Sequence, residues 1–251
     1  MTDCYEEMMA GKVYLIGLGP GMKECITPQA LSAVDACSVI ISPPDALPIL
    51  EKELQDKILI TEKMSPIARS KKAIELAEEG KTVCILSVGH PGFYAIATTF
   101  LDVLGTKDLD VEVIPGMTML DYASAKMGSP LGRDYAVISL SDQASPWEEI
   151  KARAERAVDA DLVTVIYNPI GKVGDGRLRE IVGYAQKVRN SVVGLLICIE
   201  FGVEKTVITD IEHFPFDEMT EATLVIIGNS YTKKVGNRML TPRPYAEGKG
   251  Y

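Results

Sequence analysis

The stretch VYLIGLGPGMKECITP, from Val13 to Pro28, combines a strand, a loop and the start of a helix. The apolar run at its beginning indicates a buried β-strand, and Thr27 followed by proline is typical of a helix N-terminus. Between them lies a loop with four residues of special backbone: Gly17, Gly19, Pro20 and Gly21. For this loop taken alone, two interpretations stay open, a tight turn or a close approach of a ligand to the backbone.

The order of strand and helix repeats through the first half of the chain. Apolar runs of strand length lie at 12–17, 37–41, 58–60, 82–87 and 110–114, and helical patterns lie at 28–36, 45–54, 66–79 and 93–104. Strands that alternate with helices predict a mostly parallel sheet with helices on its faces.

The pattern changes after the Pro-Gly pair at 115–116. We expect a helix at 117–126, strands at 135–140, 162–167, 192–198, 203–209 and 222–227, and helices at 146–158 and 176–189. No segment of helix length separates the last two strands, so this half is expected to include antiparallel pairing. The sequence therefore predicts two α/β domains, residues 1–116 and 117–251.

Composition and charge exclude several classes of protein. The 251 residues carry a net charge of -9, which argues against nucleic acid or an anionic membrane as the main partner. No apolar run approaches the length of a membrane span, and the acidic N-terminus does not resemble a signal peptide. Five scattered cysteines without a CxxC pair predict reduced thiols in a cytoplasmic protein, and two histidines are too few for a multi-histidine metal site.

The glycine loop does not match the common phosphate-binding patterns. Gly17 and Gly19 fit the first two glycines of G-x-G-x-x-G, but Met22 stands at the third, and Pro20 removes a backbone N–H. The helix is expected to start only at Thr27, too late for its N-terminus to hold a pyrophosphate against the loop. No Gly-Lys-Ser/Thr follows, so a Walker A loop is excluded as well.

Two further loops share this character. SVGHPGFY, residues 87–94, again follows a strand with two glycines and a proline, and VIPGMTML, residues 113–120, adds a Pro-Gly pair before a helix. Ligands of open α/β sheets bind beyond the carboxyl ends of strands. Together the three loops predict a ligand held mostly by backbone groups.

The order G-x-G-P-G, G-x-P-G-x-Y and P-G-x-T resembles the tetrapyrrole methylases, a two-domain family that transfers methyl groups from S-adenosylmethionine. Four strings of the second half resemble its branch of precorrin-3B or cobalt-precorrin-3 C17-methyltransferases: SPLGRDYAVISLSDQASPWEEI, VTVIYNP, ATLVIIGNSYT and RMLTPRPY. The resemblance covers nearly the whole chain. It implies a homodimer with the cofactor in a cleft between the two domains, and C17 methylation of a corrinoid precursor with an associated ring contraction.

The resemblance also implies a set of cofactor-binding residues. They are Pro20, Gly89, His90, Phe93, Thr118, Met119, Tyr167, Asn168, Gly228 and Asn229. It implies no metal ligand, and no general base can be named. For His90 two interpretations stay open, a general base or a side chain that hydrogen-bonds the backbone. Trp147, at a predicted helix start, is expected to be a packing anchor rather than a stacking platform.

The chain departs from the family's usual pattern in its first half. Met22 and His90 stand where the first two loops usually carry aspartate. The segments SPPDALP, residues 42–48, and EKMSP, residues 62–66, replace G-Y-K-T-Y and an element with T-G-M. Three functions therefore remain open: a C17-methyltransferase with an altered pocket, a divergent paralogue that acts on another tetrapyrrole, and a non-catalytic cofactor-binding protein.

Overall fold

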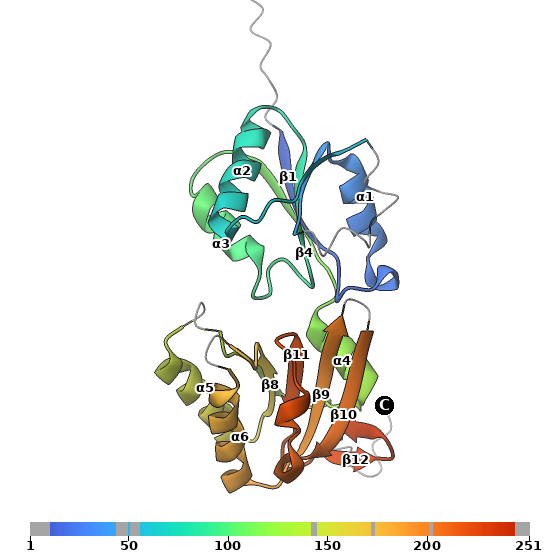
Figure 1. The fold of residues 1–251 in the computed structure, drawn as a ribbon, viewed down its shortest axis with the longest axis vertical. Coiled ribbons are helices and arrows are strands. Elements are labelled where there is room, and N and C mark those ends of the chain that lie inside the picture. Colours follow the sequence, from blue (N-terminus) through green and yellow to red (C-terminus); the bar gives the residue numbers. More distant parts are fainter. Residues whose placement is uncertain are drawn as a thin grey trace, which may run out of the picture. The chain divides into compact units, whose positions relative to one another are not determined.

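The computed structural model describes residues 11–43, 50, 56–141, 145–171, 174–200 and 203–243. Contacts divide the chain into two compact units, Met1–Met119 (unit 1) and Leu120–Tyr251 (unit 2). Both are built from strands and helices (Figure 1). The boundary expected from sequence, after residue 116, lies in the loop that precedes helix α4 (Met119–Met127).

Unit 1 contains a five-stranded sheet in the order β3-β2-β4-β1-β5, and every pair in it is parallel. Its strands are β1 (Lys12–Gly17), β2 (Val39–Ile41), β3 (Ile58–Ile60), β4 (Val83–Ser87) and β5 (Asp110–Ile114). The mostly parallel sheet predicted for the first half is therefore confirmed. Because all five strands run the same way, all their carboxyl ends meet at one edge of the sheet.

Three helices cover the two faces of this sheet. Helix α1 (Pro28–Ala36) packs on one face, and helices α2 (Pro66–Glu78) and α3 (Ile96–Leu104) pack on the other (Figure 1). Thr27 caps α1, because its Oγ1 accepts a hydrogen bond of 3.1 Å from the N–H of Ala30. The expected helix at 45–54 lies outside the described residues, apart from Leu50, which is buried.

Helix α3 begins three residues later than the sequence predicts. The segment before it turns, and Tyr94 adopts a left-handed backbone with φ 54°. Such a conformation ends any helical path, so residues 93–95 belong to the loop.

Unit 2 contains a mixed five-stranded sheet in the order β10-β9-β11-β8-β7. Its strands are β7 (Tyr135–Ser139), β8 (Val163–Tyr167), β9 (Val192–Glu200), β10 (Val203–Asp210) and β11 (Thr223–Ile227). Strands β7 and β8 are parallel, whereas β11 runs antiparallel to both β8 and β9, and β10 runs antiparallel to β9. The expected antiparallel pairing is confirmed, but β9 lies between the last two strands of this sheet, so they do not pair with each other.

Helices α5 (Trp147–Asp159) and α6 (Gly176–Val188) cover one face of this sheet, and α4 packs on the other. Trp147, the first residue of α5, packs against the hydrophobic core that α5 and α6 form with the sheet, as expected of a packing anchor. On the α4 face, the sulfur of Met127 fills the space beside Gly194, where a Cβ would approach it to 2.5 Å.

A small sheet of three strands was missed by the sequence analysis. Strand β13 (Arg238–Leu240) pairs with β12 (Lys233–Val235) and with β6 (Gly128–Ser129), the two residues that follow α4. These strands are too short to produce an alternating pattern.

Short 3-10 helices at Lys23–Cys25, Ile211–His213 and Phe216–Glu218 complete the described elements. Within the described ranges, no helix has the length and apolar character that crossing a bilayer requires.

Candidate functional site

Three loops of unit 1 meet backbone against backbone at the carboxyl ends of β1, β4 and β5. Gly19 and Gly89 exchange two hydrogen bonds, of 3.3 Å and 2.7 Å. A Cβ built on Gly17 would lie 2.5 Å from the carbonyl oxygen of Gly89, and one on Gly116 would lie 2.2 Å from the same oxygen. We call Gly17, Gly19, Gly89 and Gly116 the glycine junction.

Glycine occurs in this junction for more than one physical reason. Gly17 and Gly116 are required by close packing, because any side chain there would overlap the neighbouring backbone. Gly89 has φ 74°, and a Cβ placed on it would meet nothing within 4 Å. One side of Gly89 is therefore open. The first loop is thus a tight turn, as one interpretation of its sequence predicted, while the second loop leaves room beside its backbone for a ligand.

The first loop lacks a helix N-terminus that could hold a phosphate. Pro20 is buried, and Met22, half-buried, precedes the 3-10 helix Lys23–Cys25, whose last N–H bonds to the Met22 carbonyl at 3.0 Å. Helix α1 begins only at Pro28. The late helix start expected from the sequence is confirmed.

The second loop is held by its histidine. The N–H of Gly92 donates a hydrogen bond of 2.9 Å to Nδ1 of His90, and the N–H of Phe93 donates one of 3.1 Å to the His90 carbonyl oxygen. The rings of Phe93 and Tyr94 meet edge to face, with 5.1 Å between centroids. His90 therefore hydrogen-bonds the backbone, which was one of its two predicted roles.

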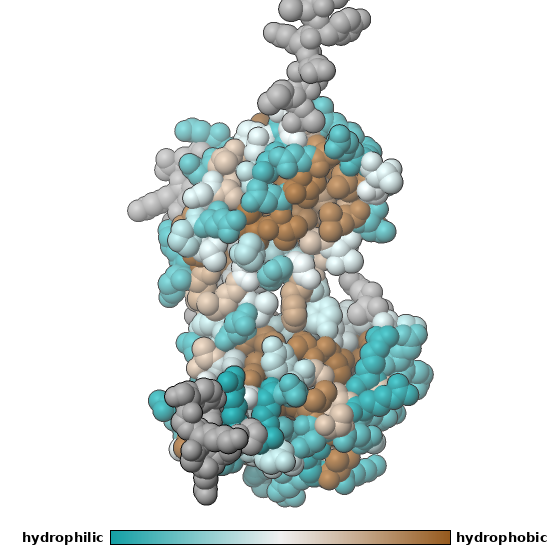
Figure 2. Space-filling model, turned by 180° about the vertical axis from the view of Figure 1, so that it is seen from behind, coloured by the Kyte–Doolittle hydropathy of each residue, from teal (hydrophilic) through white to brown (hydrophobic). Residues whose placement is uncertain are grey.

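Apolar side chains flank the glycine junction at the surface. The exposed fractions are 43% for Val88, 53% for Tyr94 and 39% for Met117. Val88 and Tyr94 belong to the second loop, and Met117 belongs to the third. Figure 2 shows that both units carry hydrophobic patches among hydrophilic side chains on the face drawn. Exposed apolar groups beside an open backbone are typical of a site for a partly apolar ligand.

In unit 2, β7 and β8 end in a cluster of side-chain hydrogen bonds. The hydroxyl of Tyr167 accepts a bond of 2.9 Å from the N–H of Leu120, in the first turn of α4. Asn168 adopts a left-handed backbone with φ 52°, and its Nδ2 donates to Oγ of Ser139 at 2.8 Å. Tyr167 and Asn168 are thus brought to the start of α4, the helix whose first residue is Met119. Strained backbone of this kind gathers at functional sites.

The structure does not bring Gly228 and Asn229 to this cluster. Strand β11 runs antiparallel to β8, with Ile227 opposite Thr164 and Val225 opposite Ile166. Residues that follow β11 therefore lie near the beginning of β8, and Tyr167 lies at its end. The structure thus separates Gly228 and Asn229 from Tyr167, and the expectation that they bind the cofactor stays a prediction.

Asn229 has a structural role instead. It is 4% exposed, and its Nδ2 donates to the carbonyl oxygen of Asp161 at 3.2 Å. Its Oδ1 accepts hydrogen bonds of 3.1 Å from the N–H of Tyr231 and from the hydroxyl of Thr232. These bonds tie the turn after β11 to the segment that enters β8.

One cluster of titratable groups was missed by the sequence analysis. The Oε1 atom of Glu204 lies 2.7 Å from the hydroxyl of Tyr122 and 2.7 Å from Nζ of Lys126. The lysine holds the pKa of the Glu204 carboxyl below its usual value, and the glutamate raises the pKa of Lys126. Burial raises the pKa of the Tyr122 phenol. The i,i+4 spacing of Tyr122 and Lys126 is visible in the sequence, but their partner on β10 is not.

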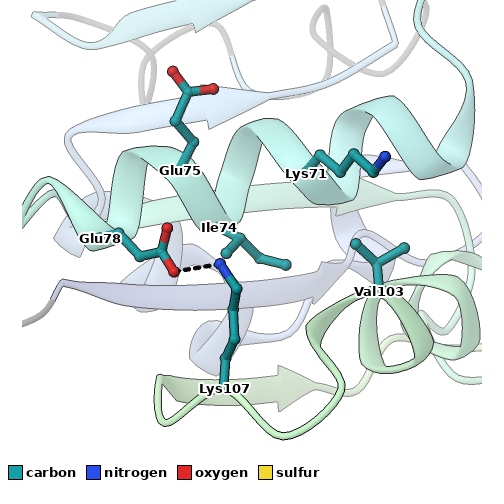
Figure 3. Close-up of a pocket in the computed structure, with 6 residues that line it drawn as sticks. All are labelled: Lys71, Ile74, Glu75, Glu78, Val103 and Lys107. Carbon is teal, nitrogen blue, oxygen red and sulfur yellow. Dashed lines mark hydrogen bonds and ion pairs between the residues drawn. The ribbon is translucent and has the colours of Figure 1, made fainter.

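A pocket of about 290 Å³ lies on another part of unit 1, between α2 and the end of α3 (Figure 3). Its lining residues are Lys71, Ile74, Glu75, Glu78, Val103 and Lys107, and Lys107 forms an ion pair with Glu78. The N–H of Gly11, which precedes β1, donates a hydrogen bond to the carbonyl oxygen of Ala77 near the end of α2. The end of α2 therefore lies at the amino end of β1, and the pocket lies toward this edge of the sheet, opposite the glycine junction. None of the predicted site residues lines it. In the described part of the chain, no group of three or more His, Cys, Asp or Glu is placed to hold a metal ion.

Comparison with known proteins defines the class. Residues 12–215 match the family of Tetrapyrrole (Corrin/Porphyrin) Methylases, and the chain belongs to this family. A probable cobalt-factor III C(17)-methyltransferase from Salmonella typhimurium is 34% identical over 92% of this chain and 98% of its own length. The cobalt-factor III methyltransferase of Priestia megaterium is also 34% identical, over 94% of this chain, which spans 46% of the length of that relative.

Solved structures support the same assignment. The methyltransferase CobJ is 25% identical, with a TM-score of 0.85 over 92% of this chain and all of that one. A uroporphyrin-III C-methyl transferase from Thermus thermophilus, solved in complex with S-adenosyl homocysteine, shares the fold with a TM-score of 0.67 at 19% identity over 87% of this chain and 97% of that one. The two-domain α/β fold expected from the resemblance is therefore confirmed.

Proposed function

We propose that this chain is an S-adenosylmethionine-dependent C-methyltransferase that methylates a corrinoid precursor at C17, with an associated ring contraction. The observation that carries the proposal is the 34% identity to the Salmonella relative over nearly the full length of both chains. The likeness to CobJ supports it. The relatives' names indicate cobalt-factor III or precorrin-3B as the substrate, and the family resemblance adds cobalt-precorrin-3.

The residues of unit 1 fit the proposed cofactor. The open side of Gly89 gives a ligand access to the backbone, and the exposed apolar residues Val88 and Met117 are sequence neighbours of Gly89 and Gly116. No helix N-terminus stands behind the first loop to favour a phosphate. When bound, S-adenosylmethionine supplies an electrophilic methyl group on a sulfonium, and it carries no phosphate.

We assign the cofactor to two groups of residues. The group in unit 1 is Pro20, Gly89, His90, Phe93, Thr118 and Met119, and the group in unit 2 is Tyr167 and Asn168. Gly228 and Asn229 are left out, because the sheet separates them from Tyr167. The glycine junction joins the first two loops by backbone hydrogen bonds and packs the third loop against them. Methyl transfer depends on alignment and desolvation of the reactants rather than on a metal or a nucleophilic side chain.

We also propose that the protein acts as a cytoplasmic homodimer. The family resemblance supports the dimer, and the free thiols of Cys37 and Cys84, both buried, fit a reducing compartment. Light scattering after size-exclusion chromatography measures the mass in solution. A mass of one chain at assay concentration would overturn the dimer.

Calorimetric titration separates the classes of ligand. We expect S-adenosylhomocysteine to bind, and ATP and NAD to give no heat of binding. Binding of ATP or NAD together with no response to S-adenosylhomocysteine would refute the methyltransferase.

An activity assay separates the three functions that the sequence leaves open. The protein is incubated with cobalt-factor III or precorrin-3B and methyl-labelled cofactor, and the tetrapyrrole is analysed by mass spectrometry. We expect the mass of one labelled methyl group to be added. Retained cofactor binding without transfer to either substrate would favour a paralogue or a non-catalytic binding protein.

A further inference from the structure

We propose that His90 positions the second loop through an unprotonated Nδ1, which makes it a neutral replacement for the aspartate that the family usually carries there. In this role His90 is a positioning residue and not the general base of the reaction. The proposal rests on the proposed function for the identity of the cofactor, but its geometric part concerns the free protein.

The hydrogen bond at His90 fixes the tautomer of the ring. The N–H of Gly92 has a proton to donate and lies 2.9 Å from Nδ1 of His90. An imidazole nitrogen can accept this bond only through its lone pair, so Nδ1 carries no proton. In the neutral ring the proton therefore sits on Nε2. His90 can present a donor at Nε2, while Nδ1 is occupied by the backbone.

The bond reproduces a turn that aspartate and asparagine form. In such a turn, a side-chain oxygen accepts a hydrogen bond from the N–H two residues further along the chain. Nδ1 of histidine and Oδ1 of asparagine are the same number of bonds from the backbone, and residue 92 is two residues after His90. The loop thus keeps its turn and loses one negative charge.

The turn holds the parts of the loop that the cofactor would approach. Gly89, before His90, is joined to Gly19 by two hydrogen bonds. After it, Phe93 bonds back to the His90 carbonyl, and Ala97 in α3 bonds to the Pro91 carbonyl at 2.9 Å. The His90 side chain lies between these fixed points. A change there would alter the loop without reaching the core.

Loss of the bond should affect ligand binding more than folding. Gly92 is exposed, so water can satisfy its N–H when the imidazole is removed. The free energy of unfolding should then change little. The loop would sample other conformations, and ordering it again would weaken ligand binding roughly three- to tenfold, the equivalent of one hydrogen bond.

The test compares two substitutions that each replace one ring nitrogen. His90→Asn keeps an acceptor at the position of Nδ1, and His90→Gln places its amide near the position of Nε2. We expect His90→Asn and His90→Asp to bind S-adenosylhomocysteine within about threefold of the wild type, and His90→Gln to bind roughly three- to tenfold more weakly. Tight binding by His90→Gln with weak binding by His90→Asn would overturn the proposal.

Nitrogen-15 NMR of the full chain without ligand gives a second readout. At alkaline pH we expect the ring of His90 to be the Nε2–H tautomer, because Nδ1 accepts the bond from Gly92. A ring protonated on Nδ1 would overturn the proposal. His213, the other of two histidines, is exposed and bonds to Asp210, so His213→Asn assigns the spectrum and serves as the matched control. If the wild type fails to bind S-adenosylhomocysteine, the proposed function fails, while the tautomer still tests the role of His90.

Discussion

The two units hold their loops by different means. In unit 1 the loops meet backbone against backbone, because side chains at Gly17 and Gly116 would overlap the neighbouring backbone. In unit 2 the corresponding positions are held by the side chains of Tyr167 and Asn229. The loop packing of unit 1 therefore requires residues without side chains, whereas that of unit 2 requires particular polar side chains.

The direction of the strands explains this difference. Unit 1 is entirely parallel, so all of its carboxyl-end loops crowd onto one edge. In unit 2, β7, β8 and β9 run one way, and β10 and β11 run the other. Its loops are divided between two edges, where each has space for side chains.

The largest effect is expected at Gly116. Gly116→Ala would place a Cβ 2.2 Å from the Gly89 carbonyl oxygen, so the junction must open and unit 1 should lose more than about 3 kcal/mol. Circular dichroism during denaturant unfolding reports on both units, whereas fluorescence of Trp147, the single tryptophan, reports on unit 2. We expect the circular dichroism transition to move to a lower denaturant concentration by more than the fluorescence transition.

Gly183→Ala is the matched control for this substitution. Gly183 lies within α6, and a Cβ there meets nothing within 4 Å. Alanine should stabilise the helix by up to about 1 kcal/mol. If Gly116→Ala were as harmless as this control, close packing would not be the reason for the glycine junction.

Asn229→Ala should produce the next largest effect. It removes the bonds to Asp161, Tyr231 and Thr232 at a buried position, which should cost unit 2 roughly 2 to 3 kcal/mol. Trp147 fluorescence during unfolding measures this loss, and exposed Asn190 provides a control as Asn190→Ala. We expect the affinity for S-adenosylhomocysteine to stay unchanged in the folded protein. A marked loss of affinity would return Asn229 to the cofactor site.

Tyr167→Phe should have a smaller effect. It removes the acceptor for the N–H of Leu120, so unit 2 should lose about 1 kcal/mol. Tyr135→Phe, at a tyrosine that is 48% exposed, should leave stability unchanged. Unfolding of the two variants side by side tests whether the hydroxyl of Tyr167 fixes the start of α4. Equal stability of both would contradict that role.

The smallest effect that we expect is a loss of folding stability at acidic pH. Because Lys126 lowers the pKa of Glu204, the folded protein holds the charged carboxylate more strongly than the unfolded chain. This stabilisation is complete above the unfolded pKa, about 4.3, and is lost as the pH falls through the lower folded pKa. We expect a contribution of about 0.5 kcal/mol, as for other partly exposed pairs.

Glu204→Gln tests this contribution. Unfolding free energies measured from neutral pH downward should fall less steeply for the variant than for the wild type. Glu221→Gln, at an exposed glutamate, is the control and should follow the wild type. A slope that Glu204→Gln leaves unchanged would show that the pair does not contribute to stability.

The sequence predicted most of the described elements, because helices and strands are local patterns. Thr27 and Pro28 mark the start of α1 correctly, and the glycine loops follow the strands as expected. Helix α3 was predicted too long, because the backbone turn at Tyr94 has no glycine to reveal it.

The candidate site was harder to predict, since it depends on pairing between distant strands. The separation of Gly228 and Asn229 from Tyr167 was not predicted, because the direction of β11 cannot be read from its own residues. Glu204 lies 78 residues after Lys126, so their ion pair was not visible. The turn at His90 was not visible either, because it is defined by the bond from Gly92.

The position of β1 between β4 and β5 has a consequence for how unit 1 is made. Both of its neighbours, β4 and β5, come from much later in the chain, so β1 cannot complete its pairing until Ile114 has been synthesised. Until then, an apolar strand has open edges, the condition in which nascent chains pair wrongly. Gly116 follows β5 directly, so a chain that stops short of this residue has neither the complete glycine junction nor its third loop.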